Sequence, residues 1–401
     1  MIKSIHIQNF KALRDTKETK IGKITLLTGI NGRGKSSFLQ SMLLLSQSLR
    51  RSQGDPKVLF STGDWCTLGN FADLVTVGAK SPVTIEFQTD ASVENKFSFQ
   101  YVPSSEKLTM GEAVSCRIDD KETIAQGEEH GVDEVGVPQF GTPEGNAEPV
   151  VAQTRTTYSD VIDLMKLANL YFVSSSRIAA SNEETIVDTF NPNYIGANGQ
   201  YILNVLSQCT QEQIKEVEKW MSVIMDGATV KVEKDEVNGR VYLYLDAENN
   251  GANFRPVNVG YGYSYIISTI LSVVLAKSGE IVIIENPEAH LHPQAQSRLM
   301  NYIIKMANEK NVQFFVETHS DHIVNASLLA LKDGMPLKML EILFFNRSNS
   351  LAEGTTVCNL QLLQNGRVVN PPRGFCDQYA IDLKKIMRPS YAQGTRTRTE
   401  N

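Results

Sequence analysis

Residues 24–39 read ITLLTGINGRGKSSFL, and this stretch decides the fold. It begins with an apolar run that includes Leu26 and Leu27 and that predicts a buried strand. The loop that follows, residues 29–36, has the form GxxxxGK[ST], and we expect a helix to begin at Lys35. The order strand, glycine-rich loop and helix is that of a P-loop, an element that binds nucleotide phosphates.

The residue types of this loop match the chemistry of phosphate binding. Glycines let consecutive backbone N–H groups curl around a phosphate, and the helix N-terminus adds partial positive charge. We expect Lys35 to reach the β- and γ-phosphates and the Ser36 hydroxyl to bind Mg²⁺, so ATP and Mg²⁺ are the expected cofactors. The predicted nucleotide-binding positions in this loop are Gly29, Asn31, Gly32, Gly34, Lys35, Ser36 and Ser37.

Composition places the chain among ordinary soluble proteins. It has 401 residues, of which 41% are hydrophobic and 21% charged, enough for two or three compact units. A net charge of −6 argues against a basic nucleic-acid binder as a whole, although a local basic face stays open. Five scattered cysteines without a CxxC pair predict free thiols in a reducing cytosol and no zinc site. No signal peptide is expected, because the N-terminal MIKSIHIQNFKAL alternates like a strand and lacks an apolar h-region. No membrane span is expected, because the apolar run 263–276 is too short to cross a bilayer.

The order of apolar and polar segments predicts an α/β fold. Apolar strands alternate with helices in the last third of the chain, which is typical of a largely parallel sheet with helices on its faces. We expect a small antiparallel β region and a helical insertion beside this sheet. The predicted units are an N-terminal lobe (1–90), an inserted middle region with an acidic, mobile loop at 125–149 (91–250), a C-terminal lobe (251–348) and a tail (349–401).

Two apolar strands deliver polar side chains to the edge of the predicted sheet where ligands bind. The strand IVIIE ends in Glu285, which we expect to hold Mg²⁺. Asn286 and Glu288 follow it and are candidates for orienting the attacking water. His319 follows the strand NVQFFV and is a candidate for contacting the γ-phosphate. Arg177, after another strand, is either phosphate-facing or a solvated loop residue.

The order of four motifs resembles a known family. GINGRGKSS, NVGYGYS, IVIIENPEAHLHP and FFVETHSDH together are similar to the ABC-type ATPases of the RecF/SMC/OLD group, and more narrowly to AAA-type ATPases of bacterial anti-phage defence operons. The resemblance implies a head with the Walker A motif at the P-loop, Glu285 at the Walker B position and His319 as the switch histidine. It also implies that residues 290–293 form the D-loop.

The resemblance further implies a second protomer. Such ATPases close two sites between head-to-tail heads, so a homodimer or larger homo-oligomer is expected. The signature segment would contact the γ-phosphate of the other protomer through Gly260, Gly262 and Ser264. VGYGYS in place of LSGGQ argues against a transporter subunit.

Departures from the family pattern limit these expectations. The catalytic glutamate normally follows the Mg²⁺ ligand directly, but Asn286 occupies that position, so either Glu288 substitutes or hydrolysis is slow. Sustained heptads are missing from residues 90–250, so the long coiled coil of the SMC type is not expected. A fused nuclease is not expected either, since no paired DxD motif follows His319.

Three functions stay open at this point. The first is an ATP-switched ATPase that controls a separately encoded effector in anti-phage defence. The second is a genome-maintenance ATPase that binds DNA, and the third is an ATP-binding scaffold with little turnover. Basic candidates for DNA contact are Arg50, Arg51, Lys384, Lys385, Arg388, Arg396 and Arg398.

Overall fold

The computed structural model describes residues 1–90, 95–118, 121–122, 164, 166–187, 194–347 and 354–387. The predicted acidic loop at 125–149 and the basic positions Arg388, Arg396 and Arg398 lie outside these residues. Within them, every helix is too short or too polar to traverse a lipid bilayer. The five cysteines carry free thiols.

A six-stranded central sheet organises the molecule. In spatial order its strands are β10 (Tyr171–Val173), β14 (Ile281–Glu285), β15 (Gln313–Glu317), β4 (Ile24–Gly29), β16 (Leu340–Arg347) and β17 (Thr355–Asn359). The first five are parallel, and β17 runs antiparallel to β16. Because parallel strands all end at one edge of the sheet, the carboxyl ends of β4, β14 and β15 meet there. The predicted α/β class with a mixed or parallel central sheet is confirmed.

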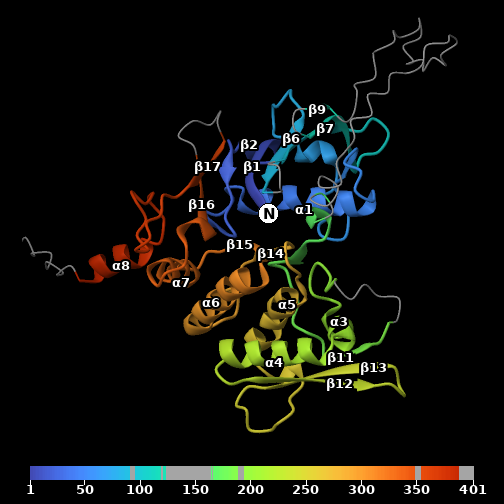
Figure 1. Cartoon of the computed structure of the whole chain (residues 1–401), viewed down its shortest axis with the longest axis vertical. Coiled ribbons are helices and arrows are strands. Elements are labelled where there is room, and N and C mark those ends of the chain that lie inside the picture. Colours follow the sequence, from blue (N-terminus) through green and yellow to red (C-terminus); the bar gives the residue numbers. More distant parts are fainter. Residues whose placement is uncertain are drawn as a thin grey trace, which may run out of the picture.

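Both faces of the central sheet are covered, which explains why its strands read as continuous apolar runs. Successive side chains of a strand point to opposite faces. On β14, Val282 and Ile284 join the core formed with helices α5 (Tyr261–Leu275) and α6 (Pro293–Lys310). Ile281 and Ile283 join a separate core on the other face, formed with helix α1 (Lys35–Arg51) and the N-terminal sheet. Figure 1 shows α1 on one side of β14 and β15, and α5 and α6 on the other.

An antiparallel N-terminal sheet of eight described strands covers the α1 side. Its strands are β1 (Ile2–Phe10), β2 (Leu13–Asp15), β3 (Thr19–Lys20), β5 (Val58–Phe60), β6 (Val83–Thr89), β7 (Asn95–Pro103), β8 (Met110–Ile118) and β9 (Lys121–Glu122). The predicted antiparallel region is therefore larger than the sequence indicated. The expected boundary at residue 90 falls between β6 and β7, which pair from Val83 with Tyr101 to Thr89 with Asn95.

The predicted middle region does not form one insertion. After β7 to β9 the chain returns to the central sheet as β10, and only then builds a smaller layer under α5. That layer holds α3 (Ile202–Gln208), α4 (Gln211–Ile224) and the three-stranded sheet β11 (Glu183–Thr185), β12 (Thr229–Asp235) and β13 (Arg240–Asp246). Helix α4 begins with a capping box in which the side chains of Thr210 and Gln213 each accept from the other's backbone N–H.

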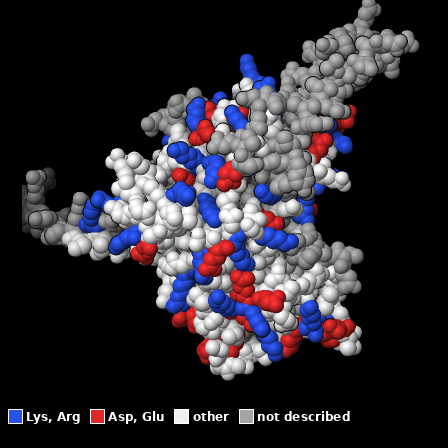
Figure 2. Space-filling view, in the orientation of Figure 1, with Lys and Arg blue, Asp and Glu red and all other residues white. Residues whose placement is uncertain are grey.

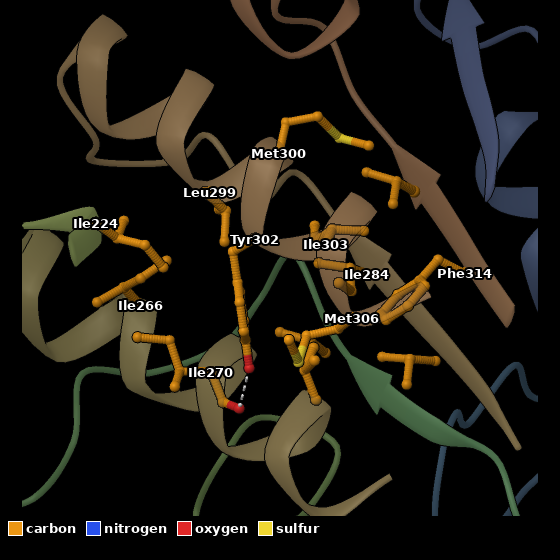
Figure 3. Close-up of a cluster of buried hydrophobic side chains, with 14 of the residues drawn as sticks. Ile224, Ile266, Ile270, Ile284, Leu299, Met300, Tyr302, Ile303, Met306 and Phe314 are labelled. Atoms are coloured by element: carbon orange, nitrogen blue, oxygen red, sulfur yellow. Dashed lines mark hydrogen bonds between the residues drawn. The ribbon is translucent and has the colours of Figure 1, made fainter. Parts of the chain in front are cut away.

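The core between the central sheet and these helices is closely packed. Tyr302 of α6 is 1% exposed, its ring lies 4.4 Å from that of Trp220, and its hydroxyl donates to the Ile270 carbonyl at 3.4 Å. Figure 3 shows Tyr302 directed toward α5 while Ile284 and Phe314 of the sheet lie beside Ile303 and Met306. This packing fixes α5 and α6, and with them the loops that connect to β14.

The tail predicted at 349–401 is only partly separate from the head. Its first described strand, β17, pairs with β16, so residues 355–359 complete the central sheet. Two helices complete the described chain on this side, α7 (Asp321–Lys332) and α8 (Gln378–Ile386), and η3 (Leu337–Met339) connects α7 to β16. The remaining short turns are η1 (Phe71–Leu74) and η2 (Pro256–Asn258). In Figure 1 helix α8 projects from the body of the molecule.

His6 of β1 forms hydrogen bonds to residues of β2 and β6, and we expect these bonds to make the stability of the protein depend on pH. Its Nδ1 lies 3.0 Å from Glu86 and its Nε2 2.8 Å from Asp15, and these hydrogen bonds raise the pKa of His6. A raised folded pKa contributes stability below the unfolded pKa, and the contribution is lost as pH rises through the folded pKa. We expect His6→Gln to lower the free energy of unfolding by about 1 kcal/mol at pH 6 and by less at pH 8.

Urea unfolding at the two pH values measures this difference. His322→Gln is the matched control, because His322 is exposed on α7 and belongs to no strand pair. An equal loss of unfolding free energy at both pH values for His6→Gln would contradict a stabilising contact of protonated His6 with Glu86 and Asp15.

Candidate nucleotide-binding site

The P-loop has the backbone that phosphate binding requires. Gly29 has φ of +126°, and a Cβ there would lie 2.2 Å from the Phe345 carbonyl oxygen of the neighbouring strand. Gly34 has φ of +87° and precedes α1 as its N-cap. Any other residue would be strained at both positions. The first turn of α1 contains no acidic residue, so its backbone N–H groups are available to an anion.

Lys35 spans the mouth of this loop. Its side chain is 3% exposed, and its ammonium donates to the carbonyl oxygens of Gly29 at 3.2 Å and Ile30 at 3.1 Å. Burial lowers the pKa of Lys35, and the nearby Glu317 carboxylate opposes that change. The ammonium is thus held where phosphates placed in the loop would replace the two carbonyls as partners.

The carboxylate next to the P-loop is Glu317, which the sequence analysis did not assign. The Ser36 hydroxyl donates to Glu317 at 3.1 Å, although Glu285 was the predicted metal partner of Ser36. Glu285 instead accepts two bonds of 2.9 Å from the backbone N–H and hydroxyl of Ser175. The reason is strand order: β15 lies between β4 and β14, so its terminal residue is nearer the loop. The only sequence signal was a glutamate at the end of an apolar strand, directly before Thr318.

The oxygen atoms around Ser36 fit a magnesium ion held together with phosphates. Glu317 and Glu285 are paired neighbours in the register of β14 and β15. Burial and the negative charge of Glu285 raise the pKa of Glu317 to about 7, and its Oε2 is buried without a hydrogen-bond partner among the described residues. No three His, Cys, Asp or Glu side chains of the described chain could hold a metal by themselves. Mg²⁺ typically takes one or two carboxylates plus water and phosphate oxygens, so this set is sufficient.

The turn after β14 directs Glu288 back to the end of β15. Asn286 has φ of +44° and donates its N–H to the Glu317 carbonyl at 2.8 Å, and its Oδ1 is buried without a partner among the described residues. The Glu288 carboxylate accepts from the Thr318 hydroxyl at 2.9 Å and from the His319 N–H at 2.7 Å. Both carboxylate oxygens are therefore oriented, whereas the Asn286 amide oxygen is not.

His319 and Glu288 line a cleft of about 610 Å³ that begins at the P-loop residues Thr28 and Gly29. Partial shielding from water and the Lys35 cation lower the pKa of His319, so its ring is neutral near pH 7. A neutral imidazole can donate to a phosphate oxygen. Gly374, Cys376, Asp377 and Gln378 also line the cleft, and the sequence analysis placed no tail residue there.

The signature segment lies at the start of α5, beside the predicted D-loop. Gly262 is packed so closely that a Cβ there would lie 2.5 Å from the His290 carbonyl oxygen. Ser264 is 1% exposed, and its hydroxyl has no partner among the described residues. Of the three positions predicted to contact a partner's phosphate, only Gly260 is exposed in this conformation. The predicted contact of Ser264 therefore requires a movement of α5.

Arg177 is neither phosphate-facing nor solvated, so both sequence interpretations are wrong. It is 4% exposed and donates to the carbonyl oxygens of Ser174, Glu285 and Asn286 at 2.9 to 3.1 Å. Burial lowers the pKa of Arg177, and the negative charges of Glu288 and Glu285 counteract this effect. The arginine therefore supports the turn after β14 from inside the protein.

The fold and this cleft together define a P-loop nucleotide-binding head. Residues 1–219 and 188–324 match the model of the AAA ATPase domain family. The chain belongs to this family, and the prediction of an AAA/ABC-type ATPase of the RecF/SMC/OLD group is confirmed.

Among curated proteins, the chain is similar to an OLD nuclease from Thermus scotoductus, with 25% identity over 350 residues. The match covers 80% of this chain and 59% of that protein, so the chain spans about three fifths of the relative's length.

Solved structures of SMC heads share the fold. A crystal structure of an SMC head bound to the C-winged helix domain of ScpA matches with a TM-score of 0.54 and 13% identity, over 90% of this chain and 98% of that one. An SMC head with an extended coiled coil, bound to the C-terminal domain of ScpA derived from Pyrococcus furiosus, matches with a TM-score of 0.51 and 10% identity, over 96% and 99% of the two chains. At these identities the likeness concerns the fold alone.

Proposed function

We propose that this protein binds ATP with Mg²⁺, hydrolyses it and uses the nucleotide as a switch. The observation that carries the proposal is that Lys35, Ser36 with Glu317, and the pair Glu288 and His319 lie at the same carboxyl edge of the sheet, where Glu288 and His319 line the cleft that begins at Gly29. Each supplies one of the parts that phosphoryl transfer to water requires, namely charge on the phosphates, a metal-binding hydroxyl and carboxylate, and an oriented acceptor for the water.

The roles follow from the contacts. Lys35 and the N–H groups at the start of α1 would bind the β- and γ-phosphates. Ser36 and Glu317 would hold Mg²⁺, with Glu285 beside them. When bound, the ion would neutralise charge on the phosphate oxygens. Glu288, whose two oxygens are fixed by Thr318 and His319, would accept a hydrogen bond from the attacking water. Of the two candidates from the sequence, Glu288 and Asn286, we therefore propose Glu288 for this role.

We further propose that the switch operates through association of heads and control of a separately encoded effector, in anti-phage defence. The support is the order of motifs shared with that group, the similarity to an OLD nuclease and the exposed position of Gly260. A DNA-binding function has less support. The Arg50 guanidinium lies 5.8 Å from the centre of the Trp65 ring and that of Arg51 lies 4.1 Å from the centre of the Phe60 ring, so both cations already have an aromatic partner. Figure 2 shows basic and acidic side chains interspersed on one face of the molecule.

ATP turnover and oligomer mass test the proposal together. Purified protein is expected to release phosphate from ATP in the presence of Mg²⁺ and to increase in mass when ATP is present. Lys35→Ala should lower turnover by about 100-fold or more, because it removes the charge that faces the phosphates. Lys338→Ala, an exposed lysine between α7 and β16, is the matched control. ATP binding and assembly without turnover would reduce the proposal to a nucleotide-held scaffold, and absence of ATP binding would refute it.

A further inference from the structure

Residues Ser174–Arg177 form the loop that follows β10, which we call the serine–arginine loop. This loop bonds to the end of β14 in two ways. Ser175 donates its backbone N–H and its hydroxyl to the Glu285 carboxylate, both at 2.9 Å. Arg177 donates to the Glu285 carbonyl at 2.9 Å from Nη1 and to the Asn286 carbonyl at 2.9 Å from Nη2. One loop thus fixes both the side chain and the backbone at the end of this strand.

A buried guanidinium is expensive unless its donors are satisfied. Arg177 is 4% exposed, and no carboxylate of the described residues forms an ion pair with it. Carbonyl oxygens accept from its two Nη groups, and two of these carbonyls belong to consecutive residues of one turn, whereas the buried Nε has no hydrogen-bond partner among the described residues. The planar fork of arginine can bond two such carbonyls at once, and the single ammonium of lysine cannot reproduce that geometry.

The position of this contact matters because the chain changes direction there. Asn286 lies in the left-handed region, and from this turn Glu288 returns to the Thr318 hydroxyl and the His319 N–H. A rotation of the Glu285 or Asn286 carbonyl would alter where Glu288 points. The two Arg177 bonds therefore act on the orientation of Glu288 without touching the cleft.

The same guanidinium also contacts helix α5. It lies 5.8 Å from the centre of the Tyr265 ring, which packs 4.6 Å from the ring of His290. The His290 carbonyl in turn packs against Gly262 in the first turn of α5. Arg177 therefore connects the turn after β14 with the helix start where the signature segment lies.

We propose that Arg177 is a positioning residue that fixes the turn Glu285–Glu288 for hydrolysis and connects it to the start of α5. The inference rests on the proposed function, since it assigns a role in the proposed reaction. It does not depend on contact with nucleotide, which Arg177 cannot make from its buried position. Ser175 supports the same turn through the Glu285 carboxylate.

Steady-state kinetics of Arg177→Lys and Arg177→Gln test this role. We expect kcat to fall by about 10- to 100-fold while the KM for ATP stays within about threefold, and lysine should not rescue because the fork is lost. Arg50→Lys is the matched control, because Arg50 also lies over aromatic rings but does not touch the turn. Wild-type kcat in both Arg177 variants, or a parallel loss of kcat, ATP affinity and melting temperature, would overturn the proposal.

Tryptophan fluorescence is a second measurement, and it tests the role of Arg177 in the turn independently of ATP turnover. Trp65 and Ser174–Ser176 line a cleft of about 400 Å³ that ends at Glu285, so Trp65 fluorescence reports on this loop. In a Trp220→Phe background, ATP is expected to change the Trp65 fluorescence. Adding Ser175→Ala or Arg177→Gln to this background should abolish the change, and adding Ser176→Ala should not. If ATP induces the fluorescence change but no phosphate is released, the proposed hydrolysis fails and with it the role of Arg177 in turnover, whereas its role in fixing the turn in response to ATP stands. If Arg177→Gln keeps the change, the inference fails.

Discussion

The Glu317→Gln protein is expected to bind ATP but to lose most of its affinity for the metal of the metal–ATP complex. Ser36, the predicted metal-binding hydroxyl, donates to Glu317 at 3.1 Å, and the second Glu317 oxygen is buried without a partner among the described residues. Glutamine keeps the size of the side chain and removes its negative charge. Replacing groups that support a metal site typically lowers metal affinity about 10- to 100-fold, and we expect a loss at the upper end of that range.

Mn²⁺ binding followed by electron paramagnetic resonance, with a non-hydrolysable ATP analogue present, measures this loss directly. Glu285→Gln belongs in the same series, because the sequence predicts that residue as the ligand. Glu341→Gln is the control. Glu341 is a partly buried glutamate at the amino end of β16, away from the P-loop, and it accepts a hydrogen bond from Asn359. If Glu285→Gln weakens Mn²⁺ binding and Glu317→Gln does not, the assignment from sequence is right and the one from strand order is wrong.

Local signals explain which parts of the fold could be predicted. The P-loop strand, its glycines and α1 follow from one continuous stretch, and the capping box at Thr210 is a four-residue signal. The apolar run of β14 indicated a strand buried on both faces, and its alternating contacts with the two cores confirm this. Each of these features depends on residues within about one turn or one strand of each other.

The sequence indicates less where strands far apart in the chain become neighbours. β15 lies between β14 and β4, and this order, which no local pattern encodes, gives Glu317 rather than Glu285 to Ser36. The sequence indicated either a phosphate-facing or a solvated Arg177, since nothing near this residue in the sequence shows that it would be buried against the end of β14. The site is therefore predictable in its residue types and less so in their partners.

Glu288→Gln is expected to lower ATP turnover by about 100-fold or more while ATP binding is retained. Glutamine is nearly isosteric, and its carbonyl can accept from the His319 N–H while its NH₂ donates to the Thr318 hydroxyl, which can reverse its role. The fold of the turn should therefore survive. What the variant loses is a carboxylate able to accept a proton from water. The protein should consequently accumulate as an ATP-bound assembly, which size-exclusion chromatography with bound-nucleotide analysis would detect.

Asn286→Gly separates this explanation from its alternative. Glycine tolerates the φ of +44° found at this position, so the turn can keep its shape while the amide is removed. If Glu288 accepts the proton, Asn286→Gly should retain most of the turnover that Glu288→Gln loses. If the order of the two losses is reversed, the amide of Asn286 orients the water, and an amide cannot take a proton from it. Hydrolysis would then be slow, because Asn286 occupies the position of the catalytic glutamate and can orient the water but cannot accept its proton.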